Sequence, residues 1–148
     1  MSERHRPTVR LLVAAVVAGS VAVLATECSF VQQQTGDAWS VTYEVRVDRP
    51  SGAALTDVRV EGAARRGDAP EVHRLGIRDT DTTDGDGSRW EHDAIVLAEQ
   101  PASVRATPPE GATATYRILL DGKREIASAT SAQPGDPVRC SANTPAFN

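Results

Sequence analysis

From residue 40 onward, apolar and polar side chains alternate in short runs, and the clearest run covers residues 40–49. The apolar residues of this run, which share one face of an extended chain, are Val41, Tyr43, Val45 and Val47. The polar residues between and after them are Thr42, Glu44, Arg46 and Asp48. Because successive side chains of a strand point to opposite faces, the run predicts an antiparallel strand with one buried and one solvated face.

A second region, residues 114–130, predicts a β-hairpin. The apolar residues that share one face of its first arm are Tyr116, Ile118 and Leu120. Asp121 and Gly122 follow, and Asp-Gly between two alternating runs favours a type I′ turn, in which both residues have positive φ. The second arm, residues 124–130, is more polar, and we expect it to lie near the edge of a sheet.

Turn-forming residues separate several further short runs. The additional strands are expected at residues 55–62, 72–77, 89–97, 103–107 and 137–141, with polar loops between them. About seven or eight short strands of this spacing predict an all-β fold, an Ig-like antiparallel β-sandwich of about seven strands. The predicted core residues are Val41, Tyr43, Val45, Val47, Trp90, Tyr116, Ile118 and Leu120. "Ig-like" describes the architecture only, because no pair of cysteines brackets a tryptophan.

The N-terminal segment differs from the rest of the chain, because residues 11–26 are uncharged and follow Arg4, Arg6 and Arg10. At about 1.5 Å per residue this run would span roughly 24 Å as a helix, a little less than a bilayer core of about 30 Å. A basic flank stays in the cytoplasm, so the segment predicts an exported domain. We expect a single-pass signal anchor at 1–28.

The expected organisation after the anchor has three parts. They are a tether at 29–39, an extracytoplasmic domain at 40–142 and a loose tail at 143–148. Two alternatives for the N-terminus remain open. Cleavage near Ala25 would release a secreted domain, and lipidation at Cys28 would require a small preceding residue, where this chain has Glu27.

Charge and composition exclude some functions. The net charge is −4, from 16 basic and 20 acidic residues, and aromatic residues make up 4% of the chain. A mildly acidic chain with few aromatic residues lacks the positive field and stacking platforms of nucleic-acid binding proteins. We therefore expect no nucleic-acid partner.

The candidate chemical motifs are weak. Four aspartates lie close together in the sequence, at Asp79, Asp81, Asp84 and Asp86. They fit no register of an EF-hand loop. A solvated loop is the preferred interpretation, and a weak surface calcium site is the alternative. His73 and His92 lack the further ligands of a metal site, and we expect His92 on an exposed strand face between Glu91 and Asp93. The chain has no nucleophile elbow or phosphate loop, so we predict no enzyme, no metal and no cofactor.

Residues 116–140, YRILLDGKREIASATSAQPGDPVRC, resemble the C-terminal part of the MmpS family of membrane-anchored transport accessory proteins. The residues that fit the family pattern are Arg117, Ile118, Asp121, Gly122 and Cys140, whereas Tyr116 stands where the family has its first cysteine. The segment VTYEV, residues 41–45, resembles the family's first strand, and Trp90 is a weaker match. The resemblance covers roughly residues 40–140.

This resemblance implies a non-enzymatic accessory protein of an MmpL-type exporter of the resistance-nodulation-division (RND) superfamily, which moves lipids or siderophores across the cell envelope. The implied partners are that transporter and the membrane. In the family the two cysteines near the last strands would pair. Because Tyr116 replaces one of them, Cys140 either forms a disulfide with Cys28 or stays free.

Overall fold

The computed structural model describes residues 36–49, 53–83 and 85–148, and in these residues the chain forms nine strands. They are β1 (Ala38–Val47), β2 (Ala54–Gly62), β3 (Glu71–Asp79), β4 (Asp81–Thr82), β5 (Ser88–Leu97), β6 (Pro101–Thr107), β7 (Ala114–Leu120), β8 (Arg124–Thr130) and β9 (Val138–Asn143). The predicted anchor and most of the predicted tether lie outside the described residues.

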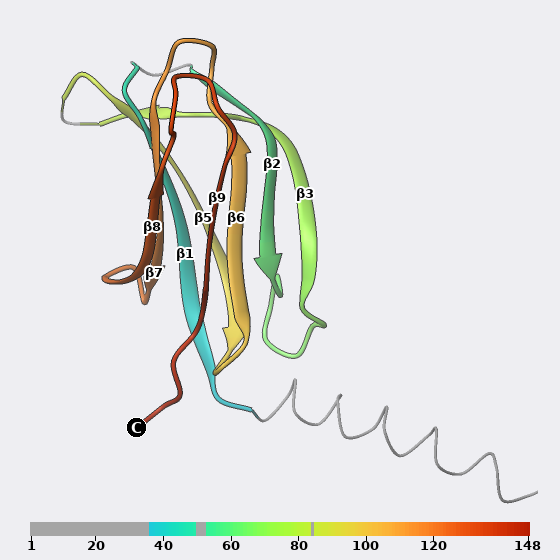
Figure 1. The fold of residues 1–148 in the computed structure, drawn as a ribbon. Coiled ribbons are helices and arrows are strands. Elements are labelled where there is room, and N and C mark those ends of the chain that lie inside the picture. The colour runs from blue at the N-terminus through green and yellow to red at the C-terminus, as the bar shows by residue number, and fades with distance from the viewer. Residues whose placement is uncertain (1–35, 50–52, 84) are drawn as a thin grey trace, which may run out of the picture.

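The strands form two antiparallel sheets whose buried faces meet in one core (Figure 1). One sheet has five strands in the order β4-β5-β1-β7-β8, and the other has four in the order β3-β2-β6-β9. This arrangement confirms the prediction of an all-β antiparallel fold. The structure has one strand more than the eight expected segments, because the predicted loop at 78–88 contains the short strand β4, which pairs with β5.

The predicted core residues are all buried, with exposures of 0–2% except for Trp90 at 8%. Two of them are tyrosines whose hydroxyl groups reach from the five-stranded sheet to the four-stranded sheet. Tyr43 on β1 donates to the carbonyl oxygen of Glu61, and Tyr116 on β7 donates to that of Ala106 at 3.0 Å. Burial raises the pKa of both phenols, so both stay neutral donors.

The predicted hairpin is confirmed. Asp121 and Gly122 have φ values of 51° and 67°, and the Lys123 N–H donates to the Leu120 carbonyl oxygen at 3.0 Å. The turn is also held against β1, because the Asp121 N–H donates to the Ser40 carbonyl oxygen at 2.8 Å. As expected, β8 is the last strand of its sheet.

The prediction of a solvated face on β1 is wrong for Glu44, which is only 2% exposed. Arg46 hydrogen-bonds its carboxylate along the same strand, at 2.9 Å from Nε to Oε1. Arg117 of β7 reaches the same oxygen at 3.0 Å, and Arg89 of β5 lies 3.7 Å from the other oxygen. The three long side chains cover the carboxylate, which is a burial that alternation along one strand does not reveal.

The prediction of a loose C-terminal tail is also wrong, as is the placement of residues 38 and 39 in a tether. Thr144 is 2% exposed, and its hydroxyl donates to the Leu97 carbonyl oxygen at 2.6 Å. Trp39 of β1 donates through Nε1 to the Pro145 carbonyl oxygen at 2.8 Å, and its ring stacks on Phe147 at 4.1 Å between centroids. An aromatic pair therefore fastens the end of the described chain to the start of β1.

Candidate functional site: a cavity at one end of the two sheets

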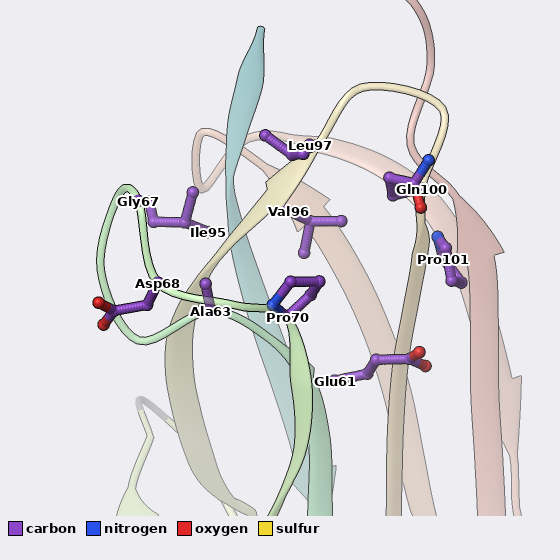
Figure 2. Close-up of a pocket in the computed structure, with 10 residues that line it drawn as sticks. All are labelled: Glu61, Ala63, Gly67, Asp68, Pro70, Ile95, Val96, Leu97, Gln100 and Pro101. Carbon is purple, nitrogen blue, oxygen red and sulfur yellow. The ribbon is translucent and has the colours of Figure 1, made fainter. Parts of the chain in front are cut away.

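A cavity of about 280 Å³ lies where β5 leads into β6, beside the loop that joins β2 to β3 (Figure 2). The residues that line it are Glu61, Ala63, Gly67, Asp68, Pro70, Ile95, Val96, Leu97, Gln100 and Pro101. This end of the domain also holds the start of β1, since the Ala98 N–H donates to the Asp37 carbonyl oxygen at 2.8 Å. The cavity is thus at the end from which the chain leads back to the predicted anchor.

The cavity lies beside a crossing between the two sheets, where Ala63, the residue after β2, pairs with Ile95 of β5. Ala63 and Ile95 exchange two backbone hydrogen bonds of 2.8 Å each. Gly62, with φ of 146°, permits this approach, because a Cβ there would lie 3.0 Å from the Ala94 Cβ and 3.2 Å from the Ile95 oxygen. Only glycine combines this backbone conformation with so little space.

Two carboxylates and a set of apolar side chains give the cavity a mixed chemistry. The Glu61 carboxylate accepts a hydrogen bond of 3.0 Å from the Ser103 hydroxyl, and Asp68 lies 3.6 Å from the Arg65 guanidinium. Ile95, Val96 and Leu97 contribute from consecutive positions of β5, as Figure 2 shows. A cavity of this kind suits a small group with an apolar body and a hydroxyl or cationic end.

Sequence reasoning did not identify any lining residue as part of a site. The cavity depends on the crossing of β2 to β5 and on a loop folded over that crossing. The single local signal is the pair Gly62-Ala63 at the end of a predicted strand, because small residues mark a close approach of backbones.

The two histidines lie near the same edge of the fold, and the predicted exposed face for His92 is wrong. Glu91 and Asp93 are exposed, so alternation places His92 on the inward side, where its ring stacks on Trp90 at 5.9 Å between centroids. Burial lowers the pKa of His92. His73 on β3 is tied through Nε2 to the Gly62 carbonyl oxygen at 3.0 Å.

The acidic residues of the predicted loop are spread over β3, β4 and the turn after it. Asp79 ends β3 and Asp81 begins β4, whereas position 84 lies outside the described residues. Between the strands, the Thr80 hydroxyl hydrogen-bonds the Ser88 hydroxyl at 2.8 Å and is buried. Across the described part of the chain, no three histidine, cysteine or acidic side chains converge as a metal site would require.

Cys140 lies on β9 with its side chain in the core, 2% exposed, and it forms no disulfide with any residue that the structure describes. Burial raises the pKa of its thiol, which keeps the sulfur protonated and unreactive. Cys28 lies outside the described residues, so the disulfide between the two remains a prediction.

The comparisons with other proteins add no relative: no protein-family model, no curated protein and no solved structure matches this chain. Among the residues that the structure describes, no helix is long and apolar enough to cross a bilayer.

Proposed function

We propose that this protein is a non-enzymatic, membrane-anchored accessory protein of an MmpL/RND-type exporter of lipids or siderophores. The N-terminal apolar segment is its anchor, and the domain of two sheets lies on the extracytoplasmic side of the cell membrane. In this role it acts by contact with the transporter and not by turnover.

The observation that carries the proposal is the β7–β8 hairpin, which contains Arg117, Ile118, Asp121 and Gly122 of the residues on which the MmpS resemblance rests. Asp121 and Gly122 form its turn, and β8 ends the five-stranded sheet. An edge strand has unpaired backbone groups that can pair with a strand of a partner. This edge supports the proposal of a contact surface for the transporter.

Replacing Gly122 by valine tests the contact. A Cβ at Gly122 meets only the Thr42 hydroxyl, at 4.0 Å, so space is not limiting, but φ of 67° strains any β-branched residue. We expect a destabilisation of about 1–3 kcal/mol and a displaced β8. Co-purification from membranes in mild detergent should recover an RND-type transporter with the wild-type chain and much less with Gly122→Val.

Gly85→Ala is the matched control, because Gly85 has no positive φ and its Cβ would meet nothing within 4 Å. It should leave stability and co-purification unchanged. Equal recovery of the transporter with both variants would contradict a role for the hairpin, and its absence from the wild-type sample would contradict the proposed partner.

The cavity favours a second candidate, a secreted binding module released by cleavage near Ala25. Its volume of about 280 Å³ approaches that of small-molecule sites. N-terminal sequencing of the mature protein separates the candidates: a start near residue 26 supports secretion, and a retained segment 1–28 supports the anchor.

A further inference from the structure

The outer face of the four-stranded sheet carries a row of four arginines, one from each strand. In the register of the sheet, Arg59 of β2 lies opposite Arg74 of β3 on one side and Arg105 of β6 on the other. Arg105 in turn lies opposite Arg139 of β9. With strands about 4.8 Å apart, the row crosses the whole sheet over roughly 14 Å.

The burial pattern shows that the row faces away from the core. Arg59 lies between the buried residues Val58 and Val60, and Arg105 lies between Val104 and Ala106, which are also buried. Arg74 and Arg139, at the two ends of the row, are exposed. The row is therefore a surface feature of the sheet.

The row is only partly neutralised by the domain itself. Asp57 has φ of 50° beside a β-bulge in β2, and its carboxylate lies 2.8 Å from Arg59 and 3.9 Å from Arg105. Glu61, on the same face, hydrogen-bonds Ser103. Arg74 and Arg139 form no ion pair with any described residue. Like charges on directly opposite positions destabilise a sheet, so the row costs stability unless an anion lies against it.

Exposed apolar side chains lie beside the same row. Val72 and Ile77 of β3 are 56% and 64% exposed, and they flank Arg74 along the strand. Val72 is two positions from Arg74 and shares its face. Arginine next to exposed aliphatic side chains is the composition of surfaces that lie in the headgroup region of a bilayer.

We propose that this face, defined by the four arginines with Val72 and Ile77, docks on the surface of a bilayer that contains anionic lipid. The inference rests on the anchored topology of the proposed function. Only nine residues separate Thr26, the end of the predicted anchor, from Gly36. At about 3.3–3.6 Å each they reach at most roughly 30 Å, which keeps the domain close to the membrane.

The acidity of the rest of the domain does not prevent this contact. Charges more than about 8 Å away are largely screened at physiological ionic strength, whereas arginines in contact with phosphate are not. Exposed aliphatic side chains beside the row can enter the headgroup region of a bilayer, and together with the nearby predicted anchor they favour a lipid surface as the partner.

The test uses the full chain in nanodiscs of phosphatidylcholine, alone or with about one third phosphatidylglycerol to supply anionic charge. In a Cys28→Ser background, Ser141→Cys places a fluorophore on the outer face of β9, next to Arg139, while the buried Cys140 thiol stays unlabelled. Thr130→Cys places the same fluorophore on the five-stranded sheet instead. The readout is quenching by spin-labelled lipid headgroups.

We expect quenching of the Ser141→Cys label in anionic discs, little in neutral discs, and none for the Thr130→Cys label. Arg74→Gln with Arg139→Gln should lower the ratio of docked to undocked protein by about 30-fold, since each arginine near an anionic leaflet contributes about fivefold. Arg65→Gln with Lys123→Gln removes the same charge from exposed positions outside the row, and this double variant should leave the quenching of the Ser141→Cys label unchanged.

Each result decides a different question. A chain that stays in the discs with a silent Ser141→Cys label overturns the docking and leaves the anchor intact. Equal loss of quenching in the two double variants would mean that net charge, and not the row, is responsible, and this also overturns the inference. A chain released from both kinds of disc overturns the anchored topology and the docking together.

Discussion

The outer faces of the two sheets differ in how their charged side chains are paired. On the five-stranded sheet, Glu44 is buried beneath Arg46, Arg89 and Arg117, and Arg117 also donates to Glu125 of β8 at 2.6 Å. On the four-stranded sheet, arginines lie opposite arginines, and Asp57 alone forms ion pairs with them in the described residues. The charges of the first face are paired within the domain. On the second face, Arg74 and Arg139 have no ion-pair partner among the described residues.

This difference has an energetic meaning. A buried carboxylate with several arginine partners stabilises a fold only while the set is complete, because removing one member leaves uncompensated charge. An exposed row of like charges costs some stability and can be removed without harm to the fold. Substitutions that remove charge should therefore lower the free energy of unfolding on the first face and raise it on the second.

The largest expected effect comes from Glu44→Ala. It removes the carboxylate that Arg46, Arg89 and Arg117 share, and we expect a loss of about 2–3 kcal/mol in the free energy of unfolding. Urea titration measures the loss. Glu91→Ala, at an exposed position opposite Glu44, should stay within about 0.5 kcal/mol. Equal effects of the two substitutions would mean that Glu44 is solvated.

A smaller effect, dependent on pH, is expected for Glu44→Gln. Burial alone would raise the pKa of Glu44, but the hydrogen bonds and charges of Arg46 and Arg117 outweigh it and lower the pKa. A lowered pKa in the folded state contributes stability above the unfolded pKa of about 4.3, and this stability is lost as pH falls through the folded value.

The free energy of unfolding of the wild-type chain should accordingly exceed that of Glu44→Gln by about 1–2 kcal/mol at neutral pH. The gap should close as the pH falls below about 4. Thermal unfolding across this range measures the gap, and a difference that stays constant with pH would show that the charge of Glu44 is not what stabilises the fold.

The smallest effect, of the opposite sign, is expected on the four-stranded sheet. Arg74→Thr removes one of two opposed like charges and adds a residue that favours strands, so it should stabilise the domain by about 0.2–0.5 kcal/mol. The gain should shrink at high salt, because screening weakens the repulsion that it relieves. A loss of stability would show that the row supports the fold, and the contrast between the faces would fail.

The sequence alone determined which residues form the core and where the main turn lies. Val41, Tyr43, Val45 and Val47 are buried because a pleated strand sends every second side chain to one side, whatever its partners are. Asp121 and Gly122 form the turn because few other residues accept positive φ at both positions. These features depend on local geometry, and local geometry is contained in a short segment.

The tertiary structure decided everything that depends on which strands are neighbours. Glu44 is buried because the register sets it opposite Arg117, 73 positions away, and next to Arg89 on β5. The arginine row exists only because four strands align with one arginine each, and the cavity is lined by Ala63 and Ile95, which pair across the two sheets just after Gly62. Pairing across a sheet joins residues far apart in the chain, so no local pattern could predict these sites.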